Sequence, residues 1–465
     1  MNNSPESWSE GLRAKWRRPL TLTALVPVGI ETEPAVRARL TALAPRLEAA
    51  LATVPDLHTL RLVAVPPQAP GESVRVLFNC VHDHLLDEHL AALMAAAGGL
   101  LAEAMTGAAF SGQPADLPGL LLRCRVPEHT FHLGAINKSV AAILAEHRLR
   151  VTIEAFADER LAAGHWNPST PAETIRREIR RHVLAQPPTA NLPTEPLPAV
   201  SAEGKFLRFF SLLVTFVLPT IGVLAPHIVR AIRRITHPAL RLAAWVGYGL
   251  WWIYGALPTG IALLLVRLLE KIEPDPAAPP IDSAKVERIE ATEDLRLKNA
   301  VTLWFTVRDT WIRRRVLSPL ILWGSERGCR HFWTVGALAD IDTIHYARIM
   351  KLDRHRTMLF MSDYDGSLDR YLMDFLGVGS SAVIPISSNV IGCPKTRWLF
   401  HPDNLAEFGP RWRTMIRAYQ LETPVWYTAY PNLTVRDILA NSAICDGLFA
   451  EEMSEADAAR WTARL

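Results

Sequence analysis

A mixed α+β fold is predicted for this chain, in which two segments of similar pattern flank a hydrophobic helical insert. Three observations predict it. Two strands followed by an acid-led helix occur near both ends, a long run without charged residues lies between them, and proline-rich stretches border that run. The length of 465 residues exceeds what one ordinary core accommodates, so we expect two or three domains.

The composition limits the classes of protein to consider. Hydrophobic residues make up 49% of the chain and charged residues 21%, with a mean hydropathy of +0.10, which favours a membrane segment. The net charge of +3 is too small to indicate nucleic acid as a partner. The 5 cysteines are scattered and lack CxxC spacing, so we expect no disulfide framework, no metal site and a reducing compartment.

The insert contains the longest uncharged run. Residues 242–266 carry no charge and are numerous enough to cross roughly 30 Å of hydrocarbon. We therefore predict a membrane-inserting segment at 205–272, with a transmembrane helix, a lipid bilayer as partner and a location in the inner (cytoplasmic) membrane. A shorter apolar run at 209–224, interrupted by Pro219, either spans as well or lies in the interface. The soluble domains are expected in the cytoplasm.

Proline-rich stretches on either side of the insert predict the domain boundaries. Residues 186–204 and 273–290 have the composition of extended, semi-rigid linkers. The first folded unit, with a helical extension, is then expected at 1–185. The second unit, with a C-terminal extension, is expected at 291–465.

An internal duplication is predicted from a recurring pattern of two strands and a helix. In the first half these elements are expected at 57–63, 73–80 and 86–94, and in the second half at 344–350, 356–362 and 368–375. Laid side by side, the two copies match at polar positions as well as apolar ones. The matched pairs are His58 with His345, Arg61 with Arg348, and Asp83 with Asp365.

Further elements complete the unit. A strand at 21–27 and a helix at 34–53 precede the pattern in the first half, and a last strand is expected at 119–126 in the first half and at 381–387 in the second. The resulting β-α-β-β-α-β order is that of a ferredoxin-like unit. Two such units pair their sheets into an α/β barrel or sandwich. The second copy begins less clearly, because 299–315 is basic and irregular.

Four ordered blocks in the last third of the chain resemble an uncharacterised bacterial membrane-associated family. They are IHYAR (344–348), LFMSDYDGSLDRYLMDF (359–375), SSNVIGCPKTRW (387–398) and PVWYTAYPNLTVRDILAN (424–441). The family carries similar IHFAR, SNYDGS, GFPRTRW and VWYxAYPGLT blocks. Two departures are that Lys298-Asn299 stands where the family prefers Gln-Asn, and Cys393 where it prefers an aromatic residue.

The resemblance implies a fold like that of dimeric α/β-barrel proteins, but no established activity. Members of the family occur alongside haem peroxidases and lipid-oxidising enzymes. An enzyme of one of these kinds is therefore the protein partner that the resemblance implies.

Acidic residues at the strand-to-helix turn near 363–369 admit two interpretations. Asp363 and Asp365 could bind a cation or act as a general base. Turn chemistry also explains them, since Asp365 and Ser367 can cap the following helix and Gly366 can turn the chain. Capping is the interpretation that we favour.

For the histidines, too, a functional and a structural interpretation compete. His345 and Arg348 lie three apart on a strand and point to opposite faces unless the strand is bulged. A single strand histidine is more often a core residue than a ligand, which applies equally to His58. The stretch VHDHLLDEH (81–89) is rich in potential ligands, but its spacing is not that of a helical HExxH pair, so no metal is predicted.

The main functional hypothesis is a membrane-attached binding or accessory protein. It would hold an apolar, lipid-like ligand between the duplicated units and serve an oxidising enzyme. Its ligand-binding residues would be His58, Arg61, Asp83, Asp363, Lys395 and Arg397.

The alternative is a haem-dependent, peroxidase-like oxidoreductase. His345 would be the axial haem ligand, and Asp365 with Arg348 would activate peroxide. Analogy of fold alone motivates this alternative. The sequence has no P-loop, GxSxG or Rossmann fingerprint, which disfavours nucleotide and hydrolase chemistry. Whether the protein is an enzyme is left open.

Overall fold

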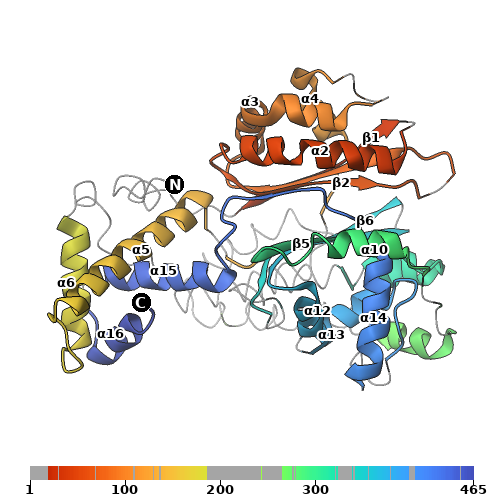
Figure 1. The fold of residues 1–465 in the computed structure, drawn as a ribbon. Helices are drawn as coiled ribbons and strands as arrows, with labels where there is room; N and C mark the ends of the chain where they lie inside the picture. The colour runs from red at the N-terminus through yellow and green to blue at the C-terminus, as the bar shows by residue number, and fades with distance from the viewer. Residues whose placement is uncertain are drawn as a thin grey trace.

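The computed structural model describes residues 19–185, 242 and 264–465, apart from gaps at 30, 69, 108–109, 111, 129, 136–137, 275–276, 278, 320, 323–337, 339–340, 354–355, 378, 397–403 and 451. The fold of this part of the chain is mixed α+β, which confirms the predicted class (Figure 1). Two four-stranded antiparallel sheets form its centre.

The two sheets are stacked face to face and share one arrangement. The first consists, in order, of β1 (Leu20–Gly29), β3 (Val74–His82), β2 (Leu57–Val65) and β8 (Val425–Thr428). The second consists of β5 (Lys298–Thr306), β7 (Thr357–Asp365), β6 (Ile344–Leu352) and β4 (Thr130–Leu133). The sheets remain separate, so the closed barrel that was one predicted alternative is wrong.

Alternation along β5 shows why the sheets stack. Val301, Leu303 and Phe305 belong to the apolar core between the second sheet and its helices. Trp304, on the opposite face, packs with residues of both sheets, and Thr302 bonds to a side chain of the first sheet. Because successive strand residues point to opposite faces, β5 contributes to two apolar layers at once.

The last strand of each half lies in the sheet of the other half. Residue 125 bridges to Ala24 at the edge of β1, and the chain then crosses to pair β4 with β6. Likewise Gln420 bridges to Leu303 on β5, and the chain then crosses to pair β8 with β2. The two predicted units therefore exchange strands, and each sheet needs both ends of the chain.

Helices cover the outer face of each sheet and give an α-β-β-α arrangement (Figure 1). The first sheet is covered by α2 (Glu33–Leu51), α3 (Leu86–Met105) and α4 (Leu117–Arg123), the second by α12 (Leu368–Gly377), α13 (Ser380–Ser387) and α14 (Leu405–Tyr419). Pro34 in the first turn of α2 is compatible with helix initiation, because the N–H it lacks would have no partner inside the helix.

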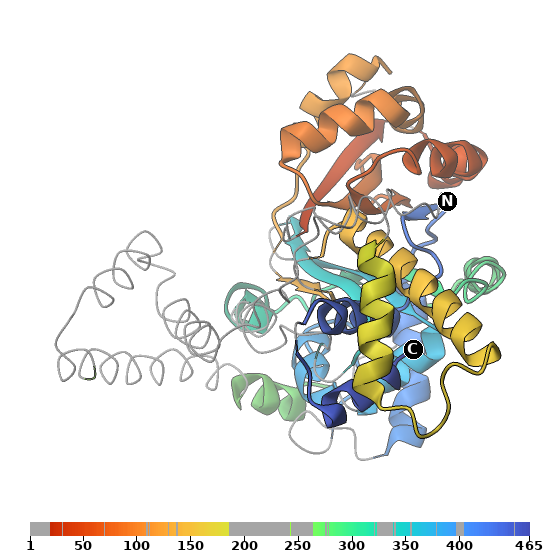
Figure 2. The same cartoon turned by 90° about the vertical axis from the view of Figure 1, so that its left-hand side faces the viewer.

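A separate helical group lies beside the sandwich and faces the viewer in Figure 2. It combines α5 (Val140–Ala162) and α6 (Ala172–Ala185) from the first half with α15 (Val435–Phe449) and α16 (Glu455–Thr462) from the second. Leu149, Ile179, Leu448 and Trp461 are among the buried residues of its apolar core. The two halves are thus joined here as well.

Several predicted elements are wrong. Residues 119–126 and 381–387 were expected to be last strands, but they lie mostly in the helices α4 and α13. Residues 299–315 were expected to be irregular, yet they contain most of β5 and the start of a π-helical turn at Arg313–Leu317. The 273–290 linker contains the helix α10 (Ser283–Glu290). Short apolar runs fit a buried helix and a buried strand equally well, which explains the errors at 119–126 and 381–387.

The structure contradicts the predicted transmembrane helix and the inner-membrane location that followed from it. Among the residues that the structure describes, no helix combines the length and the apolar character that crossing a bilayer requires. Most of the predicted insert, including 209–224 and 243–263, lies outside these residues. Its described end packs into the protein, because Val266 is fully buried in the core beneath the second sheet and Arg267 donates to the carbonyl oxygen of Thr396 at 2.8 Å.

Candidate functional site

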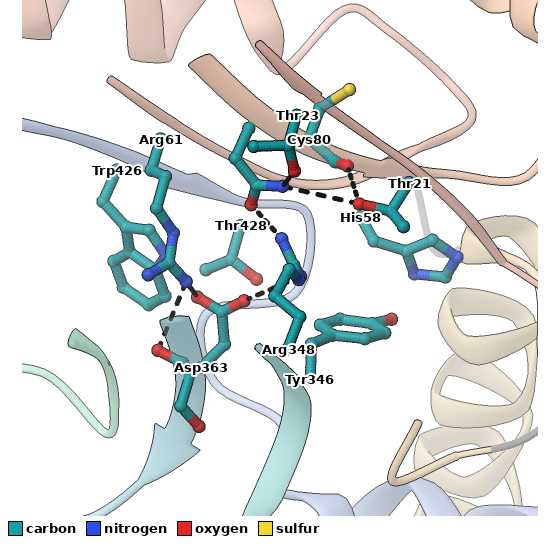
Figure 3. Close-up of polar contacts among 12 residues, drawn as sticks. Thr21, Thr23, His58, Arg61, Cys80, Tyr346, Arg348, Asp363, Trp426 and Thr428 are labelled. Atoms are coloured by element: carbon teal, nitrogen blue, oxygen red, sulfur yellow. Dashed lines mark hydrogen bonds and ion pairs between the residues drawn. The ribbon is translucent and has the colours of Figure 1, made fainter. Parts of the chain in front are cut away.

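Charged side chains from both sheets meet in the space between them (Figure 3). Arg61 on β2 forms an ion pair with Asp363 on β7 of the opposite sheet. The same guanidinium donates to the carbonyl oxygens of Val301, at 2.9 Å, and Ser362, at 3.2 Å. Asp363 also accepts a 2.9 Å hydrogen bond from Nε1 of Trp426 on β8. The pair therefore ties the two sheets together.

Arg348 on β6 approaches the same carboxylate from the second sheet. Its Nη2 lies 3.7 Å from Oδ2 of Asp363, and its Nη1 donates to the side-chain oxygen of Asn79 on β3. Asn79 in turn donates to the hydroxyl of Thr23 at 2.9 Å. Burial lowers the pKa of Arg61 to about 10, against the opposing effect of Asp363, so Arg61 stays protonated at neutral pH. Two buried arginines thus share one carboxylate.

His58 belongs to a chain of hydrogen bonds at the end of the first sheet. Its Nε2 lies 2.8 Å from Oδ1 of Asp83, so this nitrogen donates to the carboxylate. Its Nδ1 lies 2.9 Å from the hydroxyl of Tyr430, and that hydroxyl lies 2.8 Å from the hydroxyl of Tyr346. The other oxygen of Asp83 accepts from the backbone N–H of Val140, the first residue of α5, at 2.8 Å.

His345 forms the matching histidine–aspartate pair at the end of the second sheet. Its Nε2 lies 2.7 Å from Oδ1 of Asp365, and Oδ2 accepts from the backbone N–H of Val435, the first residue of α15, at 2.8 Å. Asp365 therefore binds the N-terminus of α15, and the predicted cap of α12 is wrong for this residue. Ser367 does cap α12, because its hydroxyl accepts from the N–H of Arg370 at 3.3 Å.

Lys298 is a fully buried lysine near the His345–Asp365 pair. Its Nζ lies 3.9 Å from the centre of the Tyr430 ring and 3.4 Å from the hydroxyl of Thr428. Burial lowers the pKa of Lys298 to about 7, although Asp365 and Asp363 oppose the shift. Burial, followed by the charge of Lys298, lowers the pKa of His345. This buried amine is thus stabilised by a cation–π contact and by long hydrogen bonds.

Seven of the predicted site residues meet in this one network, and all of them are at most 8% exposed. They are His58, Arg61, Asp83, His345, Arg348, Asp363 and Asp365. Lys395 lies elsewhere and donates to the backbone oxygen of Glu273, while Arg397 lies outside the described residues. Because the network is buried and its groups are largely paired with one another, its chemistry suits holding the sheets in register.

Sequence reasoning missed several members of the network. Lys298 was noticed only as a departure from a family motif, and Tyr346 and Asn79 gave no signal beyond a place on a strand. Trp426 and Tyr430 lie in the core, 8% and 2% exposed. Tryptophan and tyrosine in a predicted core could have indicated a buried polar network, since a buried indole N–H or phenol needs a hydrogen-bond partner.

An apolar cavity of about 60 Å³ lies on the other side of the second sheet. Leu303, Phe305 and Phe360 line it from the sheet, and Phe375 and Trp412 line it from α12 and α14. Thirteen of the fourteen lining residues are apolar or aromatic, and the exception is Ser387 at the end of α13. The space is thus suited to hydrocarbon and offers water few partners.

A second polar cluster lies at the start of α3. Asp56, His82 and His89 converge there, with the two imidazole rings stacked 4.1 Å apart. Burial lowers the pKa of His82 to about 4. Burial alone would also lower the pKa of His89, but its hydrogen bonds with Asp56 and Cys80 outweigh burial and raise that pKa to about 9.

No known protein family matches the chain, and neither the curated proteins nor the solved structures contain a significant match. The family resemblance of the C-terminal blocks therefore stays a prediction. Function has to be inferred from the geometry of the sites.

Proposed function

We propose that this protein binds an apolar ligand, such as an acyl chain, in the cavity between the second sheet and helices α12–α14. The cavity and its nearly uniform apolar lining are the observation that supports the proposal. A preformed apolar space surrounded by a packed core is the usual setting for hydrocarbon ligands. The proposed ligand site thus differs from the expected one. The ligand was expected between the duplicated units, but paired charged groups fill the space between the two sheets.

The size of the cavity limits what enters it. About 60 Å³ is less than half of the roughly 150 Å³ of an engineered cavity that takes up benzene. One end of an acyl chain therefore fits inside the cavity, while the remainder of the ligand lies outside it. Phe360, Val383 and Ile386 line the cavity and are only half-buried, so they mark where the chain would enter.

The same proposal includes two copies of a ferredoxin-like unit. The first half supplies β-α-β-β-α elements followed by a short segment beside its own first strand, which is the ferredoxin-like order. The second half follows the same order, with the π-helical turn at Arg313–Leu317 between its first two strands. Further support comes from the residues that follow the exchanged strands. Gly134 N–H donates to the carbonyl oxygen of His345 at 2.8 Å, and Ala429 N–H donates to that of His58 at 3.0 Å.

The residues of the alternative site do not fit haem. Nε2 of His345 already bonds to Asp365, the side chain is 2% exposed, and Tyr346 and Tyr430 lie against it, with ring centres 6.4 and 6.1 Å away. Arg348 is bonded to Asn79 between the sheets. An axial ligand needs a free nitrogen facing a large apolar space, and His345 does not line the apolar cavity.

A role beside another enzyme follows only from the family resemblance. The resemblance of the C-terminal blocks implies a haem peroxidase or lipid-oxidising enzyme as the neighbouring protein. In that setting the bound acyl ligand would be the molecule on which both proteins act. Ligand binding itself does not depend on this partner.

A binding titration tests the proposal. A fatty acid with an environment-sensitive fluorophore should bind the full chain saturably, with one ligand per protein. Val383→Phe should weaken binding about tenfold, because filling the mouth excludes roughly two methylene groups at ~0.8 kcal/mol each. Val286→Phe, at a half-buried valine of α10, is the matched control and should bind like the wild type. Equal affinities of the two variants, or no saturable binding by folded wild type, would refute the proposal.

A further inference from the structure

The cluster at the start of α3 brings together three side chains that are distant from the apolar cavity in the fold. Asp56 immediately precedes β2, His82 is the last residue of β3, and His89 lies in the first turn of α3. One ligand atom of each residue lies within 4.8 Å of the other two. The side chains are nearly inaccessible, with exposures of 2%, 1% and 0%.

Two atoms in this cluster have unfilled hydrogen-bonding capacity. Oδ1 of Asp56 and Nε2 of His82 are buried and lack a partner in the part of the chain that the structure describes. A buried polar atom without a partner costs about 1–3 kcal/mol, so such atoms are rare without a reason. Both are acceptors, one on a carboxylate and one on an imidazole, and a cation would satisfy the two together.

The tautomer of His82 is fixed in the form that metal ligands use. Its Nδ1 donates to the backbone oxygen of His84 at 3.0 Å, which leaves the lone pair on Nε2. Histidines that bind metals usually donate their other ring N–H to a carbonyl or carboxylate in this way. His89 holds its Nδ1 2.9 Å from Oδ2 of Asp56, so two of the three groups already meet.

A partly exposed histidine lies next to the cluster. The side chain of His84 is 45% exposed, and its Nδ1 lies 3.8 Å from Oδ2 of Asp56. On the inner side, the thiol of Cys80 lies 3.6 Å from Nε2 of His89 and is fully buried. The cluster therefore adjoins a solvent-exposed side chain on one side and the buried thiol on the other.

We propose that Asp56, His82 and His89 bind one divalent transition-metal ion, for which Zn²⁺ is the probe. Two imidazoles and one carboxylate suit Zn²⁺ and its first-row neighbours, whereas Ca²⁺ and Mg²⁺ prefer all-oxygen sites. Three protein ligands leave a fourth position open. A bound ion takes the place of the proton that His89 shares with Asp56, and the two stacked rings tilt so that their lone pairs converge.

The residue spacing explains why this site was not expected. A helical HExxH pair places both histidines on one helix face, but here a strand end and a helix start supply them. Asp56 comes from the turn just before β2 and is brought to the site by pairing of β2 with β3, in which Leu57 lies opposite His82.

Zinc titration of metal-free full-length protein tests the proposal by calorimetry. The wild type should bind one ion per chain at this site. His82→Gln and Asp56→Asn should each weaken binding at least about tenfold, since changing even a residue that only orients a metal ligand typically costs 10–100-fold. His165→Gln, at an exposed histidine beyond α5, is the matched control and should bind as the wild type does.

Two further measurements keep the test decisive. Circular dichroism establishes that each variant is folded, and Asp56→Asn, which preserves the size of the side chain, decides the matter if His82→Gln does not fold. Co²⁺ should give visible absorption bands in the wild type that both variants lose. Unchanged Zn²⁺ affinity in a folded variant, or no saturable Zn²⁺ binding by the wild type, would overturn the site. Neither result bears on the fatty-acid titration, which probes the opposite side of the sandwich.

Discussion

His58 and His345 are the bulged residues at matching positions of the two sheets. The register of β2 with β3 shifts between Leu57 and Thr59, and that of β6 with β7 shifts between Ile344 and Tyr346. A bulge places an extra residue opposite one partner and re-aims its side chain. The bulge is what allows each histidine to reach the aspartate at the end of the neighbouring strand.

The first prediction concerns these two aspartates. Asp83→Asn and Asp365→Asn should each lower the free energy of unfolding by about 1.5–3 kcal/mol, the range for hydrogen bonds to a charged group. Each carboxylate accepts from a histidine and from the N-terminal N–H of a helix, and an amide can accept only one of the two. Urea denaturation measures the change.

The control for this prediction is Asp309→Asn. The side chain of Asp309 is 81% exposed and pairs with Arg314 at the surface. We expect its effect to stay within about 0.5 kcal/mol, as for most surface substitutions. A loss of the same small size at Asp83 and Asp365 would mean that the two histidine–aspartate pairs do not stabilise the fold.

The second prediction is a pH dependence caused by Lys298. In the unfolded chain this amine keeps its proton up to its ordinary pKa of 10.5, whereas burial lowers the pKa in the fold to about 7. Between these values the unfolded state binds more protons, so the contribution of Lys298 to stability rises with pH from about 7 towards 10. Below pH 7 both states are protonated and the contribution is constant.

Comparison with Lys298→Met isolates this effect, because the other titrating groups are common to both proteins. Urea unfolding at a series of pH values from 6 to about 10 should show wild type gaining stability relative to the variant as pH rises. A difference that does not change with pH would show that Lys298 stays protonated in the fold.

The third prediction contrasts two glycines inside helices. At Gly447 in α15 an added methyl group would overlap the ring of Trp461, which packs α16 against α15. Gly447→Ala should therefore destabilise by about 1–3 kcal/mol through overpacking. At Gly99 in α3 the same methyl group meets nothing within 4 Å, so Gly99→Ala should stabilise by about 0.5–1 kcal/mol through helix propensity.

Thermal or urea denaturation of both alanine variants checks this contrast. Opposite signs are expected from the same chemical change, because one site is crowded and the other is open. If Gly447→Ala were neutral, α16 would have to move away from α15 at little cost, and the apolar core of the helical group would contribute little.

Much of the fold could be predicted from local pattern. The long strands and the helices of the duplicated pattern lie close to where alternation and acid-led turns placed them, as for β2, β3, β6 and β7. The exchanged strands could not be predicted, because β4 and β8 have only four residues each and pair with a distant part of the chain. No local signal records such a partner.

The network between the sheets was predicted as separate residues, without its pairing. His58 and Asp83 were both singled out, but their bond depends on a bulge that spacing does not reveal. Asp56 was missed entirely, since a single acid before a strand resembles any turn residue. Its role emerges only when β2 and β3 pair and bring it beside His82.

Exchange of β4 and β8 has a consequence for synthesis on the ribosome. Thr59 finds its partner only when Thr428 has been made, so the edge of β2 stays uncovered while most of the chain emerges. An uncovered apolar strand edge invites pairing with other chains, and pairing across such a distance in sequence is slow. A nascent or truncated chain would therefore leave this edge open to other chains, whereas the finished protein covers it with its own C-terminal strand.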